Sequence, residues 1–185
     1  MRMNQNPGKG TPDRLATSIH NGDTVSIPVG APVVLVSNGT NDGIDVVLPT
    51  TSNSAQLVQA FKYGVASKTM AVGDFAEAVV FGVHNNLLLI RQTRASSTNT
   101  WNTEAARSVG DYLTVVSNLN GFITTVTAIG ALTVSTGTVT VNVQTVWPDA
   151  VLMQTLASYA SSASATSDTR TAITASVKAF VHLMF

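Results

Sequence analysis

The chain has 185 residues, which is enough for one domain with a sizeable core. A second, fully independent domain would have little room, so we expect one main domain. Charged residues make up only 11% of it, against about a quarter in ordinary soluble proteins, and 10 basic residues balance 10 acidic ones. A chain of zero net charge has no long-range field to attract nucleic acid or an anionic membrane, so we expect neither as a partner. The absence of cysteine excludes disulfides, thiolate metal sites and cysteine nucleophiles.

The first 22 residues are polar and contain prolines and glycines but little that could anchor a core. We predict an extended N-terminal arm over residues 1–22, which either has no role or docks on a neighbouring subunit. Its basic side chains, Arg2, Lys9 and Arg14, are the candidate contacts. This start lacks the apolar segment of a signal peptide, and we expect no export through the general secretory route.

From residue 23 to 185 the sequence favours a single mainly β domain, a β-barrel or a β-sandwich of the jelly-roll kind. Short runs rich in Val, Ile, Thr and Ala alternate with Gly, Asn and Pro, as is typical of such domains. Between residues 138 and 144 every second residue is Val, so that strand should cover a core on one side only. The predicted strands are 24–27, 33–37, 44–48, 63–67, 76–83, 87–93, 112–117, 122–128, 132–135, 139–146 and 177–184.

Two short helices complete the predicted fold. Asp149 can cap a helix over about 149–163, where apolar residues recur at helical spacing, and a single turn is expected near 103–107. We expect hairpin or loop tips at 37–43 and at 84–86, where residues that tolerate positive φ separate apolar runs.

A short motif repeats along the chain. Val-Gly-Asp followed by an aromatic residue opens a predicted strand at 72–75 and again at 109–112, and Asn-Gly-Asp at 21–23 is expected to act similarly. In each case Gly-Asp supplies the turn and the next residue enters the sheet.

Candidate catalytic groups are few. The histidines His20, His84 and His182 have no spacing that would hold a metal ion, so we interpret them as solvated or structural. No serine lies in a nucleophile elbow. The segment 8–11 resembles part of a phosphate loop but lacks the upstream glycine and the flanking strand and helix. We expect a protein that is not an enzyme and needs no cofactor or metal.

Three polar groupings have a structural alternative to a functional role. The oxygen-rich loop 38–45 has ligands that calcium prefers, but Pro49 replaces the final acidic ligand, so a hairpin turn is favoured. Asp74 and Glu77 should point to opposite faces of a strand and not act as a carboxylate pair. Arg91 and Arg94 could bind nucleic acid or sugar, but an ion pair at a subunit contact is the preferred interpretation.

Four segments carry a resemblance to a known family: GDTVSIPVGAPVVLV (22–36), FKYGVASKTMAVGDFAEAVVFGV (61–83), VGDYLTVVS (109–117) and TSDTRTAITASVKAFVHLMF (166–185). With these segments the chain resembles the head decoration, or cement, proteins of tailed bacteriophages. The resemblance implies a small β-barrel or β-sandwich that self-associates as a homotrimer, or as a homodimer as second choice. It also implies binding to the outer surface of the capsid, across joints between major capsid subunits, with no catalytic residues. The protein would be made in the host cytoplasm and reside on the virion.

The alternative is a receptor-binding or carbohydrate-binding module of a phage fibre. Trp101, Trp147 and Tyr112 would then be the stacking platforms. Aromatic residues make up only 6% of the chain, which argues against a dedicated sugar binder.

Overall fold

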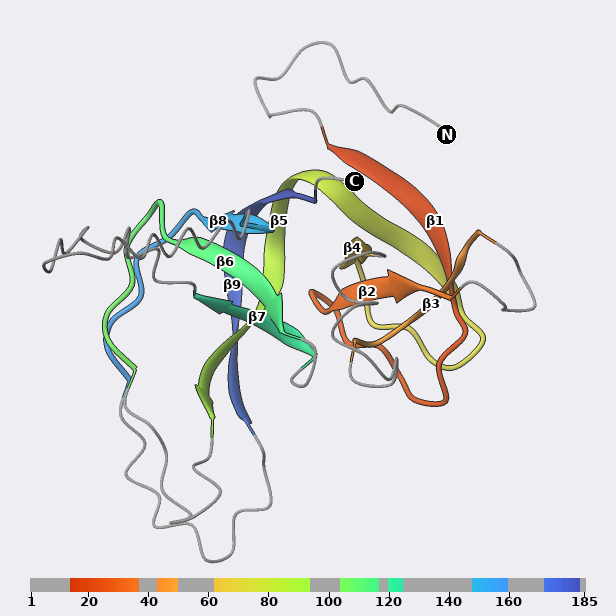
Figure 1. Ribbon diagram of the computed structural model, residues 1–185, viewed down its shortest axis with the longest axis horizontal. Coiled ribbons are helices and arrows are strands. Elements are labelled where there is room, and N and C mark those ends of the chain that lie inside the picture. The colour runs from red at the N-terminus through yellow and green to blue at the C-terminus, as the bar shows by residue number, and fades with distance from the viewer. Residues whose placement is uncertain are drawn as a thin grey trace, which may run out of the picture.

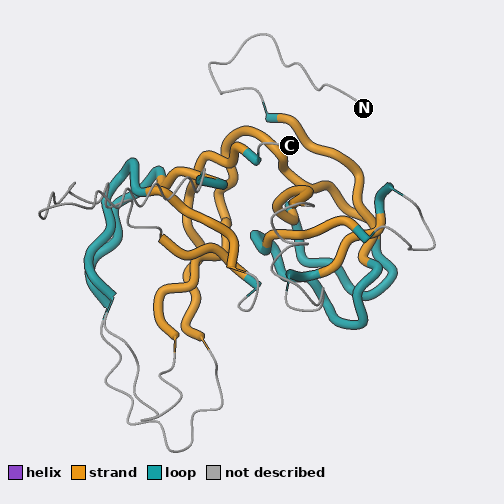
Figure 2. The backbone as a smooth tube through the Cα atoms, viewed as in Figure 1, coloured by secondary structure: helices purple, strands orange, loops and turns teal. Residues whose placement is uncertain are grey.

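The structure is a computed structural model that describes residues 14–36, 43–49, 62–93, 104–116, 120–124, 148–159 and 172–183. These residues form strands and isolated bridges and contain no helix, which confirms a mainly β protein (Figure 2). The predicted strands 132–135 and 139–146 lie outside the described residues. The strands are β1 (Leu15–Asn21), β2 (Pro32–Leu35), β3 (Asp45–Val47), β4 (Lys62–Ala66), β5 (Phe75–Thr93), β6 (Tyr112–Val116), β7 (Gly121–Thr124), β8 (Ala150–Leu152) and β9 (Ala172–His182).

All nine strands belong to one sheet whose pairings close into two rings that share β5. The first ring runs β1-β3-β2-β4-β5 and closes through the β1–β5 pairing. The second runs β5-β7-β6-β8-β9 and closes through the β5–β9 pairing. Figure 1 shows β5 bending from one group of strands into the other. Because the long strand belongs to both rings, neither ring is complete without it.

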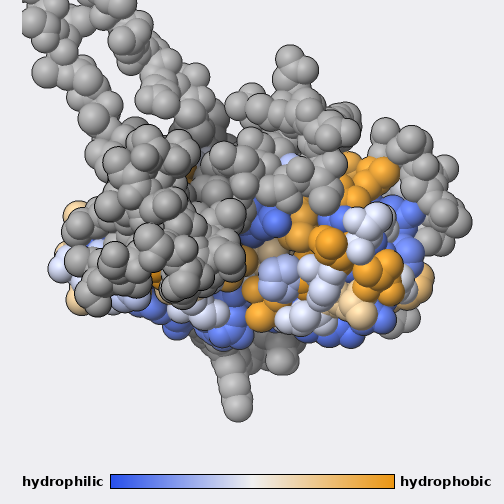
Figure 3. Space-filling view, turned by 90° about the horizontal axis from the view of Figure 1, so that it is seen from below, coloured by the Kyte–Doolittle hydropathy of each residue, from blue (hydrophilic) through white to orange (hydrophobic). Residues whose placement is uncertain are grey.

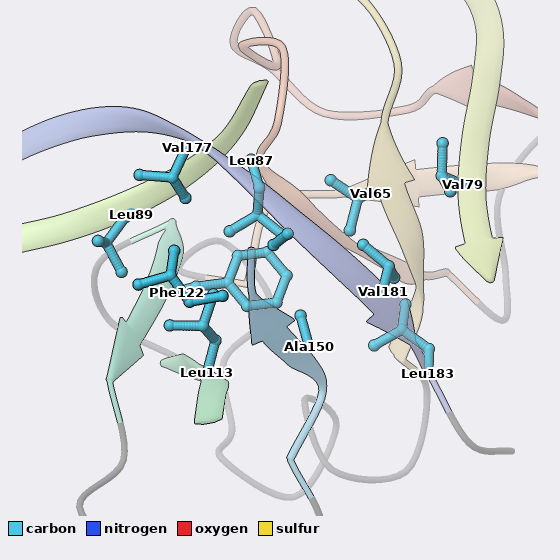
Figure 4. Packing of buried hydrophobic residues seen from close by; sticks show 12 residues of the cluster. Val65, Val79, Leu87, Leu89, Leu113, Phe122, Ala150, Val177, Val181 and Leu183 are labelled. Carbon is cyan, nitrogen blue, oxygen red and sulfur yellow. The ribbon is translucent and has the colours of Figure 1, made fainter. Parts of the chain in front are cut away.

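The buried apolar residues form two clusters, one centred on each ring, although Val65 of β4 belongs to the second cluster and the first includes loop residues as well as strand residues. In β9, Val177, Ala179 and Val181 are buried and the residues between them are not. The second core contains Phe122, the largest fully buried side chain, which Figure 4 shows close to Leu87, Leu113 and Ala150. The first core consists of Ile19, Ile27, Ala31, Val33, Val46, Leu48, Ala66, Met70 and Ala78.

The predicted turn at 84–86 is wrong, because β5 runs through it without a break. The predicted strands 76–83 and 87–93 are therefore two halves of one strand. The polar residues at this point form an irregularity, since the register of pairing with β9 shifts between His84 and Leu87. An extra residue bends a strand without ending it, and this bend follows shortly after Phe81, where β5 exchanges its partner β1 for β9.

The predicted arm is too long, because residues 15–21 form β1 and pair with both β3 and β5. Ile19 lies fully buried in the first core, and the small polar residues around it conceal the strand in the sequence. Residues 1–13 lie outside the described part of the chain. The predicted strand 24–27 is reduced to a single bridge between Ile27 and Met70.

Neither predicted helix is present in the described residues. Residues 150–152 form β8, which pairs with β6 and β9, and Leu156 and Tyr159 form bridges to the segment 104–107. Asp149 does not cap a helix, because its Oδ2 accepts hydrogen bonds from the Val115 N–H (2.7 Å) and the Thr114 hydroxyl (3.0 Å). Cross-strand pairing satisfies these backbone groups and overrides the helical spacing.

A glycine in the loop before β2 makes the closest approach to the bend of β5. Gly30 donates its N–H to the Ala66 carbonyl (2.8 Å) and accepts from the Leu88 N–H (2.9 Å). Its φ is 79°, and a Cβ at this position would lie 1.7 Å from the Asn86 carbonyl oxygen. Only glycine fits, because any side chain would collide with the backbone of β5.

We expect Gly30→Ala to destabilise the protein far more than Gly73→Ala. Both residues have φ near 80°, so both substitutions incur the cost of the left-handed conformation, about 1–2 kcal/mol. A Cβ at Gly73 meets nothing within 4 Å, whereas at Gly30 the backbone must move. Urea unfolding should give an additional loss of about 2 kcal/mol or more for Gly30→Ala. Equal losses would contradict the close approach.

Candidate functional site

The two Val-Gly-Asp motifs form turns with the same geometry, at 71–74 and at 108–111. The glycine of each turn has a positive φ, 80° at Gly73 and 98° at Gly110. In each turn the aspartate N–H donates to the carbonyl of the first residue, at 3.1 and 3.2 Å. The aspartate Oδ2 accepts from the N–H of that same residue, at 2.9 and 3.0 Å. The carboxylate therefore closes each turn, and a positive φ makes glycine the favoured residue at the third position.

Each turn is also fixed to a neighbouring strand by the same pair of hydrogen bonds. The glycine N–H donates to the carbonyl of Asn21 in the first ring (3.0 Å) and of Leu152 in the second (2.9 Å). The aspartate carbonyl accepts from the N–H of that same residue, at 2.9 Å in both cases. A doubly bonded bridge precedes each turn, Ile27–Met70 in one ring and Arg107–Leu156 in the other. The motif seen in the sequence is thus a structural repeat with one copy in each ring.

The third Gly-Asp segment does not open a strand, so that part of the prediction is wrong. It follows the end of β1, where Asn21 Nδ2 donates to the carbonyls of Val25 (3.1 Å) and Ala71 (3.0 Å). The Asp23 carboxylate accepts from the Leu48 N–H at 2.8 Å. These buried polar side chains connect loops of the first ring.

His84 lies at the bend of β5 and is 5% exposed. Its Nε2 lies 3.1 Å from the Ala66 carbonyl, which can only accept, and its Nδ1 lies 3.2 Å from the Asn86 N–H, which can only donate. These partners require a neutral ring with the proton on Nε2. Burial lowers the pKa of His84 below the ordinary 6.5 and the nearby Arg14 acts in the same direction, while the hydrogen bond to Ala66 opposes them.

The oxygen-rich loop predicted at 38–45 is described only from residue 43. Its last carboxylate, Asp45, is buried in β3 and lies 2.6 Å from Nδ1 of His20. The His20 ring in turn packs against Phe75, with 4.6 Å between centroids. The Asp45 carboxylate therefore joins β3 to β1, which is a structural role.

Arg91 forms an ion pair within the chain. Its Nε pairs with the buried Glu104 carboxylate, and its guanidinium lies 5.1 Å from the centre of the Tyr159 ring. Arg107 Nε approaches the same carboxylate at 3.4 Å. This cluster attaches the bridged segments 104–107 and 156–159 to β5. Arg94 lies outside the described residues.

The described residues contain no cluster of three His, Cys, Asp or Glu side chains that could hold a metal ion. Asp74 closes a turn, and Glu77 is exposed on β5 opposite Ser18. A search of the same residues for a helix long and apolar enough to cross a membrane finds none.

Apolar side chains form a row on the outer face of the second ring. Direct register pairs join Tyr112 to Val151, Val151 to Phe180, and Phe180 to Val83, across β6, β8, β9 and β5. The Phe81 ring packs edge-on against Phe180, with 5.0 Å between centroids. We call these five residues the outer apolar row. Phe81 and Tyr112 are each 44% exposed, so the row is open to a partner.

The face of the molecule seen in Figure 3 has a mixed surface. Figure 3 shows apolar residues beside hydrophilic ones on the face that it presents. Of the predicted contact residues, Arg14 is exposed at the start of β1, while Arg2 and Lys9 lie outside the described residues. Of the predicted stacking platforms, Tyr112 belongs to the outer apolar row. Trp101 and Trp147 lie outside the described residues.

Sequence reasoning missed Phe81 and Phe180 as surface residues. Phe81 lies in the run 78–83, which contains no polar side chain, so period-two alternation does not say which of its residues face outward. Phe180 could have been found, because it shares the parity of Lys178 and His182, while Val177, Ala179 and Val181 share the other.

We expect the stability of the protein to fall as the pH drops below 6.5, and His84→Gln to reduce that fall. The unfolded chain binds a proton on this ring near pH 6.5, while the folded chain resists it until the lower folded pKa is reached. The stabilisation that His84 contributes is therefore fully present above pH 6.5 and is lost as the pH falls from 6.5 to the folded pKa. The loss from one group cannot exceed about 1.4 kcal/mol per pH unit. Urea unfolding at pH 7.5 and 5.5 measures the effect.

The matched control is His182→Gln, which alters a partly exposed histidine on β9. An identical pH dependence in wild type and His84→Gln would contradict the assigned ring state.

Comparison of the chain with protein families, with curated proteins and with solved structures finds no significant match. The described residues give a two-ring β scaffold with a duplicated turn and an outer apolar row.

Proposed function

We propose that the protein is a viral structural protein, a decoration or cement protein that binds the outside of an icosahedral phage capsid. In this role it stabilises contacts between major capsid subunits and works without catalysis, cofactor or metal. It is present in many copies on the virion surface, because each copy adds a modest area of interface and the sum stabilises the shell.

The observation that carries the proposal is the outer apolar row. A row of Val, Phe and Tyr side chains that crosses four strands on an outer face gains stability when a neighbour covers it. The chain also has few charged residues, so its surface loses little hydration when it is buried. Both features suit a protein whose surface is buried in an assembly.

The finer fold belongs to the same proposal. We infer that each ring of paired strands is a small β-barrel with a filled interior, since each closes on itself around a separate apolar core. Such closure leaves few free edges in the rings, which suits a protein that must not polymerise edge to edge. The barrel associates with copies of itself as a homotrimer, with a homodimer as the second choice.

The N-terminal arm is proposed as a further contact with the shell, now limited to residues 1–13. Removal of residues 1–20 would delete most of β1 and with it the buried Ile19. Arg2 and Lys9 would belong to the shortened arm, and Arg14 would mark its exposed origin.

The purified chain should bind preformed expanded shells of the cognate virus and raise their resistance to heat. A chain that begins at Arg14 should bind these shells more weakly and unfold at the same temperature as the full chain. Cosedimentation measures binding, and calorimetry of loaded and bare shells measures the added stability. Absence of binding by the full chain would contradict the proposal, and a glycan-array hit without shell binding would favour the fibre module.

A further inference from the structure

We propose that the two Val-Gly-Asp turns are twin docking points that bind the same surface element of two neighbouring copies of one partner protein. The inference rests on the proposed function, in which that partner is the shell subunit. The side chains of the two turns make the contact, and one chain engages two partner copies.

The two turns present the same side chains outward. Val72 and Phe75 are 58% and 59% exposed in the first copy, and Val109 and Tyr112 are 64% and 44% exposed in the second. These four residues are half of the large apolar side chains that stand exposed in the described part of the chain. Each turn therefore offers one valine and one aromatic ring, a pair suited to an apolar recess.

The turns are held rigidly, which favours a docking role. The aspartate carboxylate, the glycine conformation and the two bonds to the neighbouring strand are the same in both copies. A contact made by a preorganised element loses little conformational freedom on binding. Because the two elements match in backbone and in side-chain type, one partner surface fits both of them.

The positions of the turns favour two partner copies over one. The first turn opens β5 in one ring and the second opens β6 in the other, and Figure 1 shows these strand beginnings on opposite sides of the molecule. A single recess cannot reach both points. Two identical subunits side by side in a shell present the same recess twice, so one chain would bridge them and gain avidity.

The test compares two paired variants, Val72→Thr with Phe75→Thr and Val109→Thr with Tyr112→Thr, for binding to expanded shells. Threonine keeps the strand propensity at Phe75 and Tyr112 and the β-branched shape at Val72 and Val109, and it removes most of the apolar contact. Each paired variant should lose about 10²- to 10⁴-fold in shell affinity, the range expected when bivalent binding becomes monovalent. The two losses should be similar, and the combination of all four substitutions should weaken binding further than either pair alone.

Val25→Thr with Met153→Thr is the matched control, because both residues are exposed and lie outside the turns. This variant should bind shells as the wild type does. Thermal unfolding of every variant identifies loss of fold, and titration of the wild type with unassembled shell subunits should give two subunits per chain, against one for each paired variant.

The outcomes separate the two proposals. A wild type that fails to bind shells overturns the proposed function and the docking points with it. A wild type that binds, together with folded paired variants that bind equally well, overturns the docking points alone. A loss confined to one turn overturns the twin arrangement and leaves a single contact.

Discussion

The sharing of β5 is the constraint on which the rest of the structure depends. One strand supplies a wall to both rings, pairing with β1 and β4 up to Phe81 and with β9 and β7 from Phe81 onward. Each ring closes around its own core only because this strand is present in both. The strand must therefore bend without breaking, and the bend is fixed from several sides. Gly30 approaches from the loop before β2, and the neutral ring of His84 connects the bend to the carbonyl of Ala66.

The duplicated turn is the part of this scaffold that we propose to bind a partner. In each ring an aspartate at the same position of the motif closes a turn beside a strand end. Each turn places a valine and an aromatic ring outward. The buried acidic side chains of the described residues have structural roles. Asp45 pairs with His20, Glu104 pairs with Arg91, and Asp149 accepts a hydrogen bond from a backbone N–H of β6. The exposed apolar groups are the part of the described surface where a bound partner would gain most from burial.

Much of the fold could be predicted from local patterns, and the errors have physical causes. The strands that became β2, β3, β4 and β6 were recognisable because their apolar residues are bounded by turn residues. β1 was hidden, since a strand whose only large apolar residues are Leu15 and Ile19 gives no periodic signal and is defined by its two partners. The turn at 84–86 was misjudged because Asn residues favour turns, while here tertiary pairing holds them in a bulge. The Val-Gly-Asp repeat was visible in the sequence, but the exposure of its side chains depends on the closure of each ring.

The central claim is that the two rings are one cooperative unit joined through β5, and native-state hydrogen exchange tests it most directly. The amides of Val33 and Val79 report on the first ring, and those of Leu89 and Leu113 on the second. If both rings depend on one strand, the most protected amides of each should exchange through the same global unfolding, with equal free energies of opening and equal sensitivity to urea. If one set opened at a free energy lower by several kcal/mol while the other stayed protected, the rings would fold independently and the account would be contradicted.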